Sequence, residues 1–79
     1  MMDLHGKKLI LNGNEEWYVV EAVQYDGQDY VYMVNKDNNL DSMFGVVHNG
    51  EHLTIDDIDP KLYTEEILPL FVDKFKNNN

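Results

Sequence analysis

Runs of apolar, β-branched and aromatic residues alternate with short polar breaks through the first two thirds of the chain. Such runs are typical of β-strands, and Asn, Asp and Gly favour the turns between them. We expect strands at residues 8–11, 15–25, 28–35, 43–48 and 51–54. Because every break is short, the sequence predicts an antiparallel meander of four or five strands.

The dipeptide Asp26-Gly27 is the clearest local signal, since it suits the positive φ angles of a two-residue type I′ turn. Such a turn fixes the register of the hairpin around it. The expected partners are Tyr25 with Gln28, Val23 with Tyr30, Glu21 with Tyr32 and Val19 with Val34. The opposite face would carry Tyr18, Val20, Ala22, Val31 and Met33. Neither face is polar enough to lie open to water.

From Ile58 onward the apolar period changes from that of a strand to that of a helix. Two helix starts are possible, either Asp59 as N-cap with Pro60 at the first helical position, or Thr64 as N-cap. Pro69 has no backbone N–H, so we expect it to kink the helix or to begin a separate final segment. The pattern as a whole predicts an α+β fold with one C-terminal helix packed on one face of the sheet.

One helix cannot cover both faces of such a sheet, and one face is rich in aromatic residues: Trp17, Tyr25, Tyr30 and Tyr32. We expect this aromatic face to stay partly exposed, to be covered by the N-terminal segment, or to form a homodimer contact.

The 79 residues suffice for one small domain, in which we expect residues 1–6 and 77–79 to be frayed. The chain has no cysteine, no secretion signal at its start and no apolar run near the length of a membrane span. These features predict a cytoplasmic protein. Fifteen acids against six lysines and no arginine give a net charge of −9, which disfavours nucleic acids and anionic membranes as ligands.

A short acidic segment resembles the start of a calcium loop, with Asp37, Asn39 and Asp41 at the first, third and fifth positions. The sixth position is Ser42 where a glycine is needed, and the twelfth is His48 where a glutamate is needed. We therefore interpret this segment as a polar turn and expect no metal there.

The remaining candidates for chemistry are few. A two-residue turn at Asn49-Gly50 would pair His48 with Glu51 and send the rings of His48 and His52 to opposite faces, which disfavours a shared metal. No nucleophile stands beside a base, and no glycine-rich phosphate loop occurs. We expect no enzymatic activity and no cofactor; a metal-dependent reaction is the enzymatic alternative.

Acidic residues are concentrated in residues 51–66. This segment contains six acids and one lysine, Lys61, so its local net charge is −5. The acids are Glu51, Asp56, Asp57, Asp59, Glu65 and Glu66. One interpretation is an acidic patch that meets a basic partner protein. The other is that these charges stabilise the helix N-terminus and keep the protein in solution.

The order of these features resembles that of a known protein family. Residues 15–34 read Glu-Glu-Trp-Tyr-Val-Val-Glu-Ala-Val-Gln-Tyr-Asp-Gly-Gln-Asp-Tyr-Val-Tyr-Met-Val, and a Leu53-Thr54-Ile55-Asp56-Asp57 step and a helix ending in Phe75 follow. This is similar to a family of short acidic proteins of unknown function from Gram-positive bacteria and their phages. The resemblance covers about residues 13–76 and departs at Pro69. It implies a cytoplasmic bacterial or phage-borne protein and supplies no catalytic residue.

The leading hypothesis is a non-catalytic protein-binding module or adaptor. Its candidate partner-binding residues are the acids Asp56, Asp57, Asp59, Glu65 and Glu66, with Tyr25, Tyr30 and Tyr32 as aromatic anchors. The alternative is an acidic DNA mimic that inhibits a nucleic-acid enzyme, such as a phage-encoded nuclease or a CRISPR effector. A patch at one corner favours the adaptor, whereas a long stripe of acids favours mimicry.

Overall fold

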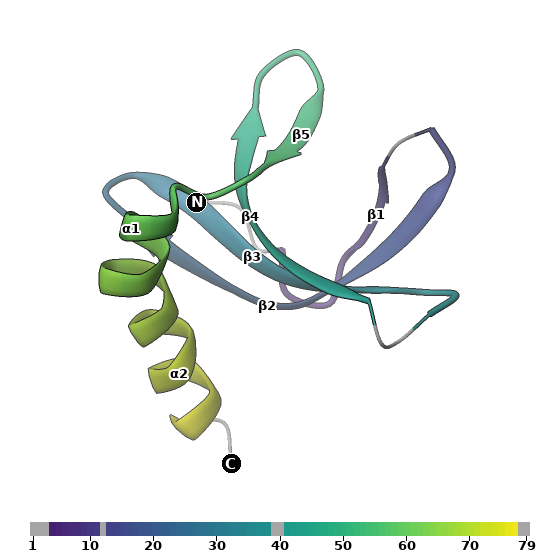
Figure 1. Ribbon diagram of the computed structural model, residues 1–79. Coiled ribbons are helices and arrows are strands. Elements are labelled where there is room, and N and C mark those ends of the chain that lie inside the picture. Colours follow the sequence, from purple (N-terminus) through teal and green to yellow (C-terminus); the bar gives the residue numbers. More distant parts are fainter. Residues whose placement is uncertain (1–3, 12, 39–40, 78–79) are drawn as a thin grey trace.

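The computed structural model describes residues 4–11, 13–38 and 41–77, which form a five-stranded antiparallel sheet followed by one helix (Figure 1). The strands are β1 (Lys8–Leu11), β2 (Glu15–Tyr25), β3 (Gln28–Asn35), β4 (Ser42–Asn49) and β5 (Leu53–Asp56), and they neighbour one another in chain order. The sheet curls into a half-barrel with the helix on its outer side (Figure 1). The predicted α+β fold, a meander sheet with one C-terminal helix, is therefore confirmed.

The hairpin between β2 and β3 forms as its turn requires. Asp26 and Gly27 have φ angles of 50° and 78°, in the left-handed region that a type I′ turn needs. The predicted pairs are present from Tyr25 to Glu21. The local sequence thus determines the register of this half of the hairpin.

Beyond Glu21 the register shifts, and Val19 lies opposite Met33 instead of Val34. One extra residue, Val20, is inserted into β2, and such a β-bulge bends the strand and increases its twist. The bulge moves Val19 and Trp17 to the inner face of the sheet. The prediction that Val19 faces Val34, and that Trp17 shares a face with Tyr25, is therefore wrong.

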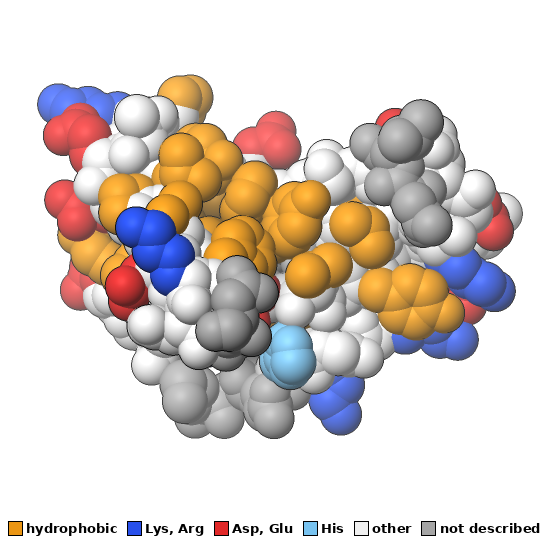
Figure 2. Space-filling model, turned by 90° about the horizontal axis from the view of Figure 1, so that it is seen from below, with side chains coloured by type: hydrophobic (Ala, Val, Ile, Leu, Met, Phe, Trp, Pro, Cys, Tyr) orange, Lys and Arg blue, Asp and Glu red, His pale blue; other side chains and the backbone are white. Residues whose placement is uncertain are grey.

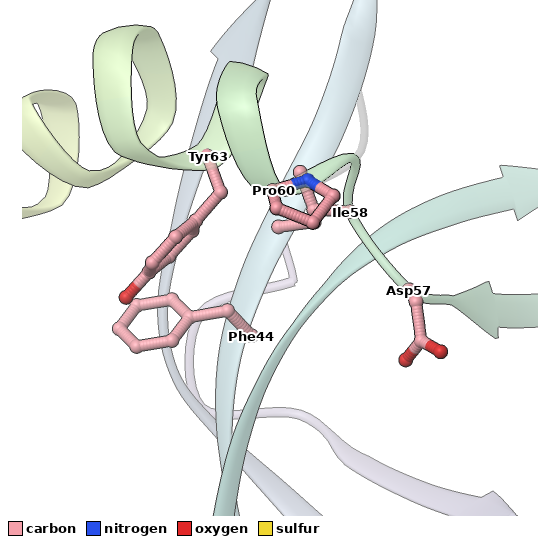
Figure 3. A pocket seen from close by; sticks show the side chains of 5 residues that line it. All are labelled: Phe44, Asp57, Ile58, Pro60 and Tyr63. Carbon is pink, nitrogen blue, oxygen red and sulfur yellow. The ribbon is translucent and has the colours of Figure 1, made fainter.

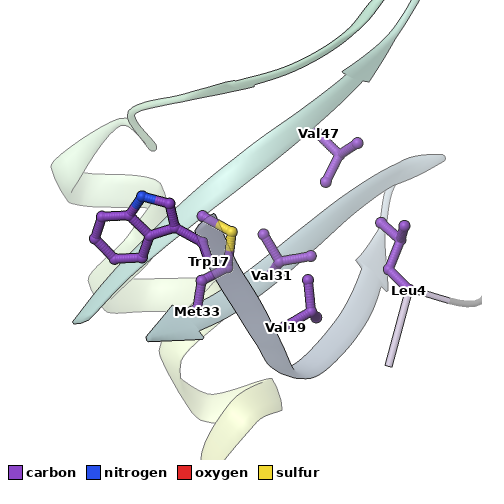
Figure 4. Close-up of a cluster of buried hydrophobic side chains, with 6 residues drawn as sticks. All are labelled: Leu4, Trp17, Val19, Val31, Met33 and Val47. Atoms are coloured by element: carbon purple, nitrogen blue, oxygen red, sulfur yellow. The ribbon is translucent and has the colours of Figure 1, made fainter. Parts of the chain in front are cut away.

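Two apolar clusters lie on the two sides of the curled sheet. The inner cluster comprises Leu4, Trp17, Val19, Val31, Met33 and Val47 (Figure 4). The outer cluster comprises Tyr30, Ile67 and Phe71, with half-buried Tyr32, Phe44 and Phe75 packed against it. The helix thus covers the aromatic face, while the curl of the sheet encloses the inner face.

The N-terminal segment is held against β2. Leu4 is only 5% exposed and belongs to the inner cluster. The Gly6 N–H donates to the Val19 carbonyl at 2.9 Å, and the Val19 N–H donates to the Lys7 carbonyl at 2.8 Å. Residues 4–6, for which fraying was predicted, are thus ordered parts of the structure, and residues 1–3 and 78–79 lie outside the described residues.

The helix runs through three consecutive segments, α1 (Pro60–Leu62), the π-helical η1 (Tyr63–Ile67) and α2 (Leu68–Asn77). Asp59 is the N-cap, since its carboxylate accepts from the Leu62 N–H at 3.0 Å, and Pro60 follows as the first helical residue. Of the two predicted starts, the first is therefore correct. The π-helical segment ends two residues before Pro69, which has no N–H to donate, and the helix continues through Pro69 instead of splitting.

The hairpin between β4 and β5 differs from its prediction. Asn49 pairs with Leu53 and His48 with Thr54, which leaves a three-residue loop in place of a two-residue turn at Asn49-Gly50. Gly50 is not among the glycines with positive φ, although a type I′ turn would require it. As a result β5 begins two residues later than expected, at Leu53.

No helix within residues 4–11, 13–38 and 41–77 is both long and apolar enough to cross a membrane.

Candidate functional site

Three of the predicted acids and one predicted tyrosine gather where the helix begins. A hollow of about 320 Å³ is lined by Tyr25, Asp59, Lys61, Leu62, Glu65 and Glu66. Tyr25 comes from the end of β2, Asp59 is the N-cap of the helix, and the others come from its first two turns. We call Tyr25, Asp59, Glu65 and Glu66 the acidic corner.

The acids of this corner are exposed and Tyr25 is half-buried. Glu66 raises the pKa of the Tyr25 hydroxyl above its ordinary value because its negative charge disfavours the phenolate. Partial desolvation of Tyr25 and the charge of Asp26 add to this effect. The direction of the shift indicates a negative potential at the corner, which a cationic partner group would relieve.

Internal neutralisation of the corner is slight. Lys61 is the one cation that lines the hollow, and its Nζ lies 4.0 Å from a Glu65 carboxylate oxygen one helical turn away. Both side chains are more than half exposed, so water and salt weaken this pair. Asp59 caps the helix through one carboxylate oxygen. Its negative charge also interacts favourably with the positive end of the helix dipole, which stabilises the helix start.

Asp56 and Asp57 do not line the hollow of the corner. Asp56 ends β5, and one of its carboxylate oxygens lies 3.1 Å from Nε2 of His48 on β4. Asp57 borders a different hollow of about 530 Å³ that Phe44, Ile58, Pro60 and Tyr63 complete (Figure 3). In Figure 3 the rings of Phe44 and Tyr63 lie together on one side and Asp57 on the other. The predicted acids are therefore split between two places.

Tyr30 and Tyr32 lie under the helix. Tyr30 is only 5% exposed, so it cannot serve as an exposed anchor in this structure. Tyr32 is half-buried, with its ring centroid 4.6 Å from that of Phe44 and 6.1 Å from that of Phe75. The aromatic face that the sequence left without a cover is thus largely closed by the helix, and of the three predicted anchors only Tyr25 borders the acidic corner.

The outer face of the sheet extends beyond the helix and is apolar there. Figure 2 shows apolar side chains running across this face, with acidic side chains along the helix side. Tyr18 and Val20, both on β2, are 40% and 39% exposed. The uncovered apolar area thus consists of residues that the sequence analysis did not select for binding.

Metal-ligating side chains do not gather elsewhere in residues 4–11, 13–38 and 41–77. In the described part of the chain, no group of three or more His, Asp or Glu side chains is placed to hold a metal ion. At the supposed calcium loop, the side-chain oxygen of Asn35 accepts from the N–H groups of Asp37 and Asn38 at 2.8 and 3.1 Å. Asn39 lies outside the described residues. These bonds form a polar turn of the predicted kind.

One polar residue of structural importance was missed. Glu21 is only 5% exposed, and its carboxylate lies 3.5 Å from the Lys74 Nζ of the helix and 4.0 Å from His5 Nε2. The sequence shows Glu21 as a charged residue within an apolar strand. It does not predict that Lys74 and His5 lie beside its carboxylate, because both are distant from Glu21 along the chain.

No protein-family model, curated protein or solved structure matches the chain. The resemblance to short acidic proteins therefore stays a prediction, and any functional conclusion depends on the geometry described above.

Proposed function

We propose that this protein is a non-catalytic protein-binding module that engages a basic surface of its partner through the acidic corner. The observation that carries the proposal is the hollow at the helix start, which Asp59, Glu65 and Glu66 line together with Tyr25, and in which Lys61 is the one lining cation. An aromatic residue beside carboxylates offers a basic side chain both an apolar surface and a counter-charge.

The net charge of −9 supports the same choice of partner. A negative protein attracts basic surfaces over long distances and accelerates their encounter, especially at low salt. The corner lies at one end of the fold on a helix start whose backbone is fixed by the Asp59 cap, so its acids are presented from a rigid element.

A DNA mimic would need carboxylates in a long row at phosphate-like spacing. The acids that the sequence singled out gather instead at the helix start and at the end of β5, and Asp56 is engaged by His48. This arrangement favours the adaptor over the mimic.

The test is affinity capture from the native cytosol with the wild type and two charge-reversed variants, followed by calorimetry with the captured partner. Glu65→Lys/Glu66→Lys should lose the partner, whereas the matched variant Glu51→Lys/Asp73→Lys, which changes the charge equally at exposed positions away from the corner, should keep it. Equal retention by both variants would refute the proposal, and competition by DNA for the captured partner would favour the mimic.

A further inference from the structure

A second cavity lies on the inner side of the sheet, between its two edge strands. It measures about 440 Å³, and Ile10 and Leu11 of β1 form one wall while Leu53 and Ile55 of β5 form the other. Trp17 on β2 and Met43 on β4 also line it. Thr54 and Asp56 complete its lining. We call this cavity the edge groove.

Both walls of the edge groove are strand edges. β1 pairs only with β2 and β5 only with β4, because these strands end the sheet on either side. Apart from these pairings, no backbone hydrogen bond of residues 8–11 or 53–56 occurs within the described part of the chain. Figure 1 shows β1 and β5 on the two sides of the half-barrel, and residues of both strands line the groove. The two free strand edges, with their N–H and C=O groups outside these pairings, therefore border one apolar groove.

Trp17, which lines this groove, carries an unsatisfied buried donor. Its side chain is 9% exposed, yet its indole N–H has no hydrogen-bond partner in the part of the chain that the structure describes. Figure 4 shows the indole at one end of the inner cluster and Leu4 and Val47 at the other. Buried indole N–H groups usually find an acceptor. A carbonyl group brought in by an occupant would supply one.

We propose that the edge groove binds an extended, apolar segment of a partner protein, which adds to the sheet as a strand between β1 and β5. An extended backbone is the occupant that can pair with a strand edge while its alternate side chains fill the apolar floor. The four-residue lengths of β1 and β5 and the cavity volume suit a segment of about four residues.

Charge restricts the occupant further. The one ionisable residue that lines the groove is Asp56, and the protein as a whole carries a net charge of −9. A neutral segment flanked by Lys or Arg therefore fits better than one flanked by acids. This site goes beyond the proposed function, since it uses none of the residues of the acidic corner.

The probes are seven-residue peptides of the form acetyl-Lys-X-Thr-X-Thr-X-Lys-amide, with X as Val, Leu or Phe. Because Trp17 is the single tryptophan of the chain, its fluorescence and its indole N–H resonance report directly on the groove. We expect saturable binding of at least one peptide with a Kd below about 1 mM, a shifted indole resonance and slower amide exchange in β1 or β5. If none of the peptides binds at concentrations up to about 1 mM, the proposal is overturned.

Two N-methylated variants of the binding peptide separate strand pairing from apolar filling. One carries methyl groups on the X amides and the other on the Thr amides, so each loses the donors along one edge but keeps its side chains. At least one of these two variants should bind about tenfold more weakly than the parent peptide. Equal binding by all three peptides would overturn strand addition.

Matched variants locate the site. Ile10 is 54% exposed at the groove and Val72 is 43% exposed on the helix, so both positions tolerate a charged residue without loss of the core. Ile10→Lys should weaken peptide binding about tenfold or more, and Val72→Lys should not. Glu65→Gln/Glu66→Gln should leave peptide binding intact, which separates the groove from the acidic corner. Binding that is lost in that double variant but kept in Ile10→Lys would overturn the proposal.

Discussion

The contact between β4 and β5 depends on the absence of one side chain. Gly45 lies on β4, and a methyl group at this position would collide with Cγ2 of Ile55 on β5 and lie 3.3 Å from the Asp56 carbonyl oxygen. Its φ angle is outside the left-handed region, so alanine is not excluded by the backbone. The effect of Gly45→Ala on the free energy of unfolding therefore depends on two opposing contributions. Alanine is favoured over glycine in a strand, and the added methyl group collides with Ile55.

The two contributions can be compared. Alanine in a strand is more stable than glycine by about 0.5–1 kcal/mol, whereas overpacking of this kind costs about 1–3 kcal/mol. Gly45→Ala should thus lower the free energy of unfolding by about 0.5–2 kcal/mol. For 79 residues the total is about 4–12 kcal/mol, so the variant should fold and the loss should be measurable.

A double-mutant cycle tests the cause of this loss. Ile55→Ala removes the colliding carbons at a cost of about 1–2.5 kcal/mol, below that of a fully buried isoleucine because Ile55 is half-buried. In that background Gly45→Ala should be neutral or stabilising, which gives a coupling energy of about 1–3 kcal/mol in urea unfolding followed by circular dichroism. Leu53→Ala serves as the control background, since Leu53 is not among the nearest neighbours of the added methyl group. Additivity within about 0.5 kcal/mol in both backgrounds would refute the proposed collision.

Three further predictions concern other parts of the molecule. Glu66→Gln should lower the pKa of Tyr25 towards its ordinary value in an NMR titration of the ring carbon beside the hydroxyl; an unchanged pKa would show that Glu66 is not its main cause. Hydrogen bonds from Lys36 and Lys8 lower the pKa of Glu16 in the folded state. Their contribution to the free energy of unfolding is therefore present at pH values above the unfolded pKa of Glu16 and is lost as the pH falls through the folded pKa. The stability difference between Glu16→Gln and the wild type should accordingly disappear in acid, and a difference that persists there must come from another source. Phe71→Ala should lower the free energy of unfolding by about 3–5 kcal/mol, because Phe71 is fully buried; a loss below about 1 kcal/mol would contradict its place in the outer cluster.

Much of the fold could be predicted because its signals are local. Asp26-Gly27 determines a turn through the φ angles it accepts, and Asp59-Pro60 determines a helix start through one cap and one fixed φ. Strand composition and the change to a helical period then define the order of the elements. These signals act over a few residues, so they do not depend on the rest of the structure.

The errors arise where distant residues decide the outcome. Val20 favours a regular strand and gives no local sign of a bulge. It is nevertheless the extra residue in β2, because the two faces of this long strand pack against different clusters. The bulge places Trp17 on the inner face, and the sequence assigned it to the aromatic face. At the candidate site, acids that are neighbours in sequence separate where the chain passes from β5 into the helix, so Asp56 pairs with His48 while Asp59 borders the corner. Such positions follow from the tertiary packing and not from the acidic composition.

The two proposed binding surfaces lie on either side of the contact between the helix and the sheet, the edge groove on the inner side and the acidic corner at the helix start. The helix buries the aromatic face, and it is tied there by Lys74, which lies 3.5 Å from the buried carboxylate of Glu21 and donates to the Ala22 carbonyl at 3.0 Å. Both contacts are made by residues that directly follow Val20, the site of the bulge. The helix is therefore attached to β2 at the point where this strand bends. Because β2 bends there, the sheet curls and its two edges border one groove, while the start of the helix carries the acids to the end of β2. The bulge that shifts the register therefore contributes to the curl that forms the edge groove. The edge groove and the acidic corner share no lining residue, so each surface can be changed without altering the other.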